Sequence, residues 1–408
     1  MSMFRRFFAV PSKLMNNFRF VIAGLILCLA VSLTTVVAHA ETASTAIKTA
    51  TAIEWQPAET IALLAGVVTW QDTSLATYTA ENRYDQQFYD ILLRRGVASD
   101  SIVYLKDNKA TLAAINQSLQ QLLARSHEQS IFLFYYTGHG DRSEDGSDTW
   151  FLNYDCDSNN FASTSLNLKT LAETIIRDFK GKKVILTADC CYSGNLNQAA
   201  DMLAASGIET MVLSSATAAN ESTGEWTFTR SLNEILTGTP LMQCAELELT
   251  AASAADYIAY NMACAEMQLS NYHLTPGFPA KFVLTKLLTS LGKNQPYLGK
   301  YMIATEEEVD YKVRIVDQNG NQCKISYPEL EGEPDIWCDY SELKEIEWKT
   351  WDVGSKVEVE WEKEWYPAQI LKREGSFHYI RYDDHEEVWN EWVAFDRIRD
   401  ITDPQISD

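Results

Sequence analysis

The sequence predicts an α/β domain, with a mostly parallel sheet and helices on both of its faces, followed by two small all-β barrels. Two observations support this prediction. From Ile61 to Leu291, short apolar runs alternate with amphipathic helical stretches, the pattern of parallel strands that are joined by helices. After residue 300 the chain changes to short segments rich in Trp and Tyr, and this part contains an internal repeat.

The α/β part contains strand and helix candidates in alternation. Strands are expected at Ile61–Thr69, Ser101–Leu105, Ile131–Tyr136, Lys183–Ala188 and Thr210–Ser214. Helices are expected at Asp85–Arg95, Leu112–Ala124, Leu168–Asp178, Asn195–Ala204 and Phe228–Leu236. Sites in such sheets form at the carboxyl ends of the strands. That rule selects two loops before any motif is considered, 137–141 and 189–194.

The C-terminal part repeats itself. Segment 314–327 matches segment 369–382 at an offset of 55, and after a short indel Trp337 aligns with Trp389. Two tandem all-β modules are therefore expected. The expected domains are an α/β domain at 59–292 and modules at 300–348 and 350–402.

The N-terminus has the pattern of an export signal. Basic residues precede the apolar run 21–38, and Ala38-His39-Ala40 is a small-x-small cleavage pattern. We expect a signal peptide at 1–40 that is cleaved on export to the periplasm or the medium, followed by a linker at 41–58. The alternative is an uncleaved membrane anchor, because 18 apolar residues are long enough to span a bilayer.

The cysteines fit an exported chain. Removing the predicted signal removes Cys28 and leaves seven of the eight cysteines, so at least one thiol is free. Cys323 and Cys338 occur only in the first repeat and are candidates for a disulfide. No cysteine and histidine spacing matches a structural zinc site.

The charge excludes one class of partner. The formal net charge is -22, and phosphate binding needs a basic face, so nucleic acid is not expected as a partner. Residues 301–408 hold 28 of the 56 acidic residues. That excess indicates either a basic partner or simply a well-solvated surface.

Two glycine-containing turns carry the residues that suggest chemistry. His139 lies in segment 137–141 and Cys191 in segment 189–194, each directly after a predicted strand. Catalysis by a sulfur nucleophile needs a thiolate, an imidazole and donors for the oxyanion. His139 and Cys191 supply the first two, and the backbone amides of Gly140 and Cys191 are candidates for the third. Either residue alone would be interpreted as structural, but their combination favours a catalytic pair.

Residues 60–290 resemble the caspase-like cysteine peptidases, and among them the metacaspases and their bacterial relatives. In that family a His-Gly segment precedes an Asp-x-Cys-x-Ser-Gly segment, and here 52 positions separate His139 from Cys191. Segments 214–216 and 224–230 also resemble the family. The resemblance implies a protease that hydrolyses protein or peptide substrates through a Cys-His pair and requires no cofactor.

The resemblance also implies roles for individual residues. Cys191 resembles the nucleophile, His139 the base, and Asp189 an acidic wall of the pocket for the residue before the scissile bond. Asp85 resembles a second acid of that pocket, and Thr137 and Ser214 are further candidates for substrate binding. Two carboxylates would favour Arg or Lys. The alternatives are a structural acceptor for Asp189 and an ordinary acid at a helix start for Asp85.

Two departures from the family pattern stand out. Tyr192 lies where metacaspases usually have His; that position is not the base, so activity is still expected. The acidic cluster that binds calcium in some metacaspases has no clear match, although Asp155, Asp157 and Ser158 form an acidic loop. Calcium activation therefore stays open, and no metal ligand is assigned.

Segments 353–370 and 379–383 resemble Tudor or Agenet domains, small SH3-like barrels that often bind peptides. The candidates for an aromatic cage that would hold a basic peptide are Trp361, Trp365, Tyr382 and Trp389. The alternative is that these rings fill the core of the barrel. A second alternative concerns the whole chain, namely a catalytically silent caspase-like scaffold that acts as a binding protein through these modules.

Overall fold

The structure is a computed structural model that describes residues 54–401 except 80, 329, 331 and 332. The predicted signal peptide and residues 41–53 of the predicted linker lie outside the described residues. Within the described ranges, no helix is long and apolar enough to cross a membrane.

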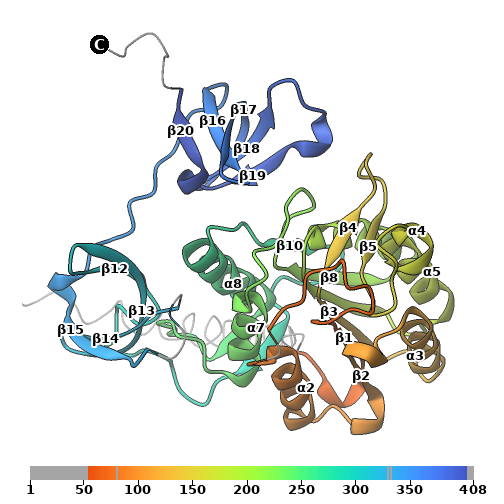
Figure 1. Ribbon diagram of the computed structural model, residues 1–408. Coiled ribbons are helices and arrows are strands. Elements are labelled where there is room, and N and C mark those ends of the chain that lie inside the picture. The colour runs from red at the N-terminus through yellow and green to blue at the C-terminus, as the bar shows by residue number, and fades with distance from the viewer. Residues whose placement is uncertain (1–53, 80, 329, 331–332, 402–408) are drawn as a thin grey trace, which may run out of the picture. The chain divides into compact units, whose positions relative to one another are not determined.

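A six-stranded sheet forms the centre of the α/β domain (Figure 1). In spatial order its strands are β10 (Asn271–Leu274), β8 (Glu209–Ser214), β7 (Lys183–Asp189), β3 (Ile131–Thr137), β1 (Thr60–Gly66) and β2 (Ile102–Lys106). All neighbours are parallel except the edge strand β10, which runs antiparallel to β8. The predicted mostly parallel sheet is thus confirmed.

Helices cover both faces of this sheet and divide its core in two. One face is covered by α3 (Leu112–Ala124), α5 (Leu168–Asp178) and α6 (Leu196–Ala205). The other is covered by α2 (Tyr84–Arg95), α7 (Thr227–Thr237) and α8 (Ala251–Glu266). Successive side chains of β3 alternate between the two cores: Phe132 and Phe134 point to one, Leu133 and Tyr135 to the other. This alternation explains why the strand is apolar at every position.

Several smaller elements were not expected from the sequence. They are the one-turn helix α4 (Phe161–Thr164), the small sheet of β4 (Gly140–Arg142), β5 (Thr149–Phe151) and β6 (Leu166–Asn167), and the pair β9 (Glu248–Thr250) and β11 (Val283–Lys286). Helix α8 and edge strand β10 were also not predicted. The sequence of α8 is rich in alanine, so its apolar stripe is weak. Its Thr250 capping box and its packing on α7 identify it only in the structure.

The C-terminal part forms two separate small sheets, each with its own core. The first consists of β12 (Tyr301–Glu306), β13 (Val309–Asn319), β14 (Gln322–Ser326) and β15 (Ile336–Asp339). The second consists of β16 (Lys356–Trp361), β17 (Glu364–Glu374), β18 (Phe377–Tyr382), β19 (Glu391–Val393) and β20 (Ile398–Asp400). Both have a register shift in the second strand, at 315–317 and 370–372. The shifts are 55 residues apart, the offset of the sequence repeat.

The suggested disulfide between Cys323 and Cys338 is not formed. The two residues lie opposite each other on β14 and β15, but both thiols are free. The Cys323 side chain is buried in the core of its barrel, whereas the Cys338 thiol donates to the Cys323 carbonyl oxygen over 3.7 Å. The two sulfurs therefore have different environments despite the matching register.

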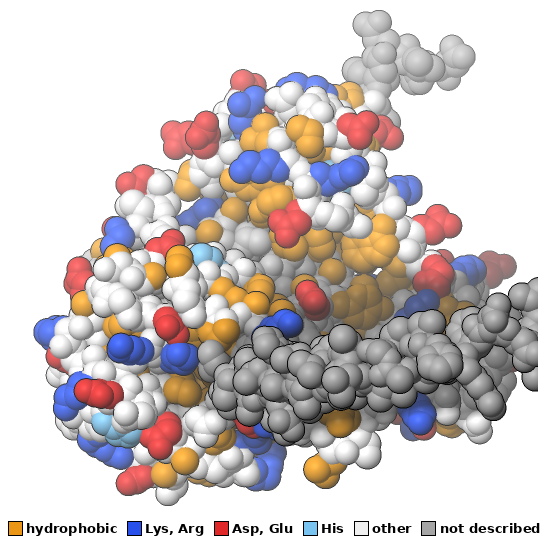
Figure 2. Space-filling view, turned by 180° about the vertical axis from the view of Figure 1, so that it is seen from behind, with side chains coloured by type: hydrophobic (Ala, Val, Ile, Leu, Met, Phe, Trp, Pro, Cys, Tyr) orange, Lys and Arg blue, Asp and Glu red, His pale blue; other side chains and the backbone are white. Residues whose placement is uncertain are grey.

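Charged side chains are mixed over the surface that Figure 2 shows. Acidic and basic groups are interspersed there, and hydrophobic groups gather in the middle of the view.

Candidate active site

The two loops selected from the sequence lie side by side. Strands β3 and β7 are neighbours, and Thr137 pairs in register with Asp189. His139 and Cys191 each follow two residues beyond that pair. A β-carbon at Gly140 would come within 2.2 Å of the Cys191 carbonyl oxygen, so only glycine allows the two loops to pack this closely.

Both ring nitrogens of His139 have hydrogen-bond partners. Nε2 lies 2.7 Å from the Ala76 carbonyl oxygen, which can only accept, so Nε2 carries the proton. Nδ1 is then the acceptor for the Tyr78 hydroxyl at 2.8 Å. The ring also packs on Trp70, with ring centroids 4.3 Å apart. Burial lowers the pKa of His139, so the imidazole is neutral and its basic nitrogen faces a tyrosine.

The Cys191 thiol is held by the loop after β8. Its sulfur accepts a hydrogen bond from the Ser222 amide at 3.2 Å. Burial raises the pKa of Cys191 to about 11, while the amides of Ser222, Gly140 and Cys191 itself act to lower it. The thiol is therefore protonated at neutral pH. The amides that favour its anion are donors that could also serve an oxyanion.

The described side chains of His139 and Cys191 form no direct hydrogen bond. The Tyr78 hydroxyl occupies the imidazole nitrogen that would otherwise be free to accept the thiol proton. The structure thus shows the pair brought to one place, but with the base engaged by another residue.

A small pocket lies beside these loops and contains Asp189. Its volume is about 20 Å³, and its other walls are Val68, Tyr78, Thr137, Gly138, Cys190, Ser222, Gly224, Glu225 and Trp226. The Asp189 carboxylate accepts hydrogen bonds from the Thr229 hydroxyl at 2.6 Å and the Thr229 amide at 3.2 Å. Burial raises the pKa of Asp189 to about 7. In this state the pocket is too small for an arginine side chain.

The structure does not bring Asp85 or Ser214 into this pocket. The Asp85 carboxylate is fully buried and is bound by the Arg83 guanidinium at 2.6 and 2.8 Å and by the Tyr104 hydroxyl at 2.6 Å. Ser214 is also fully buried, and its hydroxyl donates to the Ala216 carbonyl oxygen over 3.3 Å. Of the expected substrate-binding residues, Thr137 and Asp189 line the pocket.

Sequence reasoning missed the residues that hold the pair. Trp70, Ala76 and Tyr78 lie in the irregular segment after β1, and Ser222 lies in the segment after β8. Both segments leave the carboxyl ends of strands that neighbour β3 and β7. The strand-end rule that selected the loops of His139 and Cys191 could therefore have selected these segments as well.

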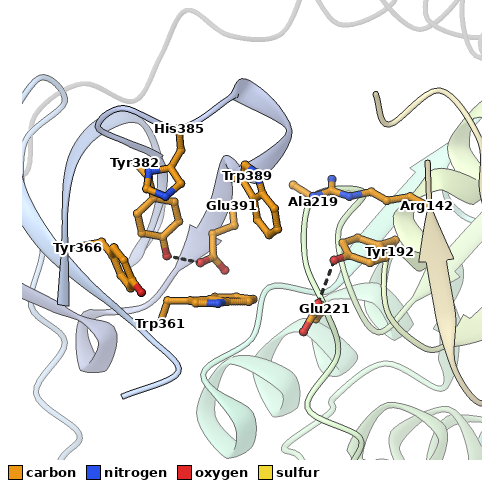
Figure 3. A pocket seen from close by; sticks show the side chains of 10 residues that line it. All are labelled: Arg142, Tyr192, Ala219, Glu221, Trp361, Tyr366, Tyr382, His385, Trp389 and Glu391. Atoms are coloured by element: carbon orange, nitrogen blue, oxygen red, sulfur yellow. Dashed lines mark hydrogen bonds between the residues drawn. The ribbon is translucent and has the colours of Figure 1, made fainter. Parts of the chain in front are cut away.

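Three of the four aromatic-cage candidates line a second pocket. Trp361, Tyr382 and Trp389 do so together with Tyr366 (Figure 3). Trp365 lies elsewhere, with the Arg399 guanidinium over its ring at 4.1 Å. Tyr382 also belongs to the barrel core, whereas Trp389 is 54% exposed.

The acidic loop beside α4 uses its carboxylates internally. Asp155 accepts from the Leu112 amide at 2.8 Å, and Asp157 accepts from the Asn159 amide at 2.9 Å. Within the described part of the chain, no three His, Cys, Asp or Glu side chains form a group that could hold a metal ion.

Two protein-family models match this chain. Residues 86–322, more than half of the chain, match the family model described as the caspase domain. The chain therefore belongs to the caspase-domain family, and its α/β fold is caspase-like. Residues 354–402 match the model described as the Agenet domain, which corresponds to the second all-β module.

Two solved structures are similar to this chain over about half of its length. Protein GSU0716 from Geobacter sulfurreducens is 16% identical, with a TM-score of 0.42, and the match covers 56% of this chain and 99% of that one. Caspase-1 from Spodoptera frugiperda is 15% identical, with a TM-score of 0.37, covering 56% of this chain and 91% of that one. No curated protein matches the sequence.

Proposed function

We propose that this protein is an exported cysteine endopeptidase that cuts polypeptides after Arg or Lys. The observation that carries the proposal is the placement of His139 and Cys191 at the ends of adjacent strands, beside a pocket that contains a buried carboxylate. The caspase domain supports the same reaction class. The Agenet domain supports an additional peptide-binding role for the C-terminal module.

The chemistry begins when the Tyr78 hydroxyl leaves Nδ1 of His139. That nitrogen then takes the proton of the Cys191 thiol, and the thiolate attacks the carbonyl carbon of the scissile bond. The amides of Gly140 and Cys191 stabilise the oxyanion. As the carbon–nitrogen bond breaks, the imidazolium returns the proton to the leaving amine. A water molecule, deprotonated by His139, then cleaves the thioester and releases the acid product and the thiol.

The carboxylate of Asp189 gives the proposed preference. An Arg side chain would find two acceptor oxygens, and Lys one compact charge contact. An Asp side chain would meet like charge in a buried site. Opening of the pocket has to accompany binding, because the volume in this state is about 20 Å³. Tyr78 lines the pocket and also binds His139, so one movement of this side chain would serve both requirements.

The test is hydrolysis of fluorogenic peptides that end in Arg, Lys or Asp, with and without calcium. We expect cleavage after Arg at least as fast as after Lys, and both far faster than after Asp. The alternative, a silent scaffold, predicts no cleavage of any peptide and no labelling of Cys191 by an Arg-containing peptide with a thiol-reactive end group. Labelling of Cys191 together with hydrolysis would exclude the scaffold.

A further inference from the structure

A second pocket, which the mechanism leaves unused, is formed by two parts of the chain. Its residues come from the catalytic domain on one side and from the Agenet barrel on the other (Figure 3). They are Arg142, Tyr192, Ala219, Glu221, Trp361, Tyr366, Tyr382, His385, Trp389 and Glu391. The pocket encloses about 220 Å³, enough for one long side chain.

Specific hydrogen bonds join the two sides of this pocket. The Asn220 side chain donates to the Trp392 carbonyl oxygen at 2.7 Å and accepts from the Trp392 amide at 3.2 Å. The Arg142 guanidinium donates to the Val388 carbonyl oxygen at 2.5 Å. These bonds connect the loop after β8 and strand β4 with the Agenet barrel, so the pocket has a defined second wall.

The walls of this two-domain pocket suit a cationic side chain. The Tyr192 ring lines one side, two tyrosine and two tryptophan rings line the barrel side, and cations bind to the faces of such rings. The carboxylate of Glu221 is exposed at the edge, accepts a hydrogen bond from the Tyr192 hydroxyl at 3.1 Å, and forms no ion pair within the described residues.

The other charged groups of the pocket already have partners. Glu391 is bound by the Arg397 guanidinium at 2.7 and 2.9 Å. The Arg142 guanidinium lies over the Tyr192 ring at 4.3 Å, in addition to its hydrogen bond to the barrel. Glu221 is therefore the exposed carboxylate of this pocket that a cationic ligand can pair with, because a neutral hydroxyl is its partner among the described residues.

The pocket is adjacent to the nucleophile along two segments of the chain. Tyr192 directly follows Cys191. Glu221 directly precedes Ser222, whose amide lies 3.2 Å from the Cys191 sulfur. A polypeptide that crosses Cys191 therefore passes close to this pocket, because an extended chain advances by roughly 3.3 Å per residue.

We propose that the two-domain pocket is a second substrate subsite, which holds an Arg or Lys side chain of the same polypeptide that is bound for cleavage at Cys191. This inference rests on the proposed peptidase function. It assigns the Agenet barrel a direct part in substrate selection, since the barrel supplies one wall. The preferred substrate then carries two basic residues at a fixed spacing, one for the Asp189 pocket and one for the two-domain pocket.

The test uses the full-length Cys191→Ala protein, so that binding is measured without cleavage. The probes are fluorescein-labelled peptides of Gly, Ala and Ser with a central Arg and a second Arg at each of several positions on either side. A matched set carries citrulline, the neutral isostere, in place of the second Arg. We expect the second Arg to tighten binding about tenfold over citrulline at one or two adjacent positions, the effect of a desolvated cation–π contact with a nearby carboxylate.

Two variants test whether the advantage of Arg over citrulline comes from this pocket or from nonspecific charge attraction. Trp389→Ala and Glu221→Gln should each abolish the advantage of Arg over citrulline. Trp337→Ala is the matched control, because Trp337 aligns with Trp389 in the first module and is 49% exposed against 54%. This control should keep the full advantage.

Four results would overturn the inference. The first three are equal binding of Arg and citrulline peptides at every position, an advantage of Arg that does not depend on position, and loss of the advantage in Trp337→Ala. The fourth is tighter binding of a peptide with Glu in place of the second Arg, since Arg142 would then be the selecting charge. Failure of the wild-type protein to cleave any of these peptides would refute the peptidase function instead. The binding comparison would then still show whether the pocket binds a basic side chain.

Discussion

Replacing Asp189 by Asn tests the site most directly. The substitution keeps the shape of the side chain and removes its charge. In the wild type, burial raises the pKa of Asp189 from 3.8 to about 7. A carboxylate with a raised pKa in the folded state favours folding while it is protonated, and that stability is lost as pH rises from about 4 through 7. The Asn side chain does not ionise, so the stability of the variant should not fall over this pH range.

The size of the effect follows from the pKa difference. A shift from 3.8 to about 7 is roughly 3 pKa units, or about 4 kcal/mol of free energy of unfolding lost by the wild type between pH 4 and pH 8. Asn can still accept the hydrogen bonds from Thr229, although more weakly than a carboxylate. Binding of an Arg substrate should lose on the order of 2–5 kcal/mol, the range for removing one partner of a buried charge pair.

Steady-state kinetics of fluorogenic peptides between pH 5.5 and 9, with thermal unfolding at the same pH values, measures both effects. Wild-type kcat/KM for an Arg peptide should rise through pH 7 as Asp189 ionises. In the Asn variant this rise near pH 7 should be absent. Burial lowers the pKa of His139 below 6.5, so ionisation of His139 should not produce a rise there. Two results would refute the assignment of Asp189 as the acid that selects Arg. They are an unchanged preference for Arg over Asp in the variant, and a rise in kcat/KM near pH 7 that persists after the substitution.

Three further predictions concern the nucleophile, the base and the N-terminal segment. Cys191→Ala should abolish hydrolysis while Cys190→Ala largely spares it, since Cys190 is buried in the core under β7; comparable loss in both, measured with the Arg peptide, would leave the nucleophile unassigned. Tyr78→Phe removes one hydrogen bond to the base and should raise the rate of Cys191 alkylation by iodoacetamide about fivefold, the equivalent of about 1 kcal/mol; an unchanged or slower rate would contradict a restraining role. N-terminal sequencing of protein from the exported fraction should begin at Glu41, whereas an intact Met1 or Ser2 start there would favour an anchor.

The order of elements in the caspase domain was predictable because each strand and helix has a strong local signal. Helices α3 and α5 begin and end at the predicted residues. The strand-end rule then placed His139 and Cys191 at one edge of the sheet, since parallel strands that are buried on both faces end at the same side. The sequence repeat also predicted two barrels, and the register shifts 55 residues apart confirm it.

Contacts between distant segments were not predictable in the same way. Asp85 had the position of a pocket acid, but the structure pairs it with Arg83 and Tyr104, because a fully buried carboxylate needs a cation and donors. The contact of Tyr78 with His139 joins an irregular segment to a loop 61 residues later. Local sequence patterns contain no signal for such a pair.

Residue types and their spacing determined which chemistry this chain can carry: an imidazole and a thiol after two parallel strands, and aromatic rings in a small barrel. The tertiary structure alone decided which groups hold the imidazole, which carboxylate lines the pocket beside the two loops, and that the barrel supplies one wall of a second pocket. The physical reason is that periodicity reports which face of an element is buried, whereas the partner of a polar side chain depends on packing between elements far apart in sequence.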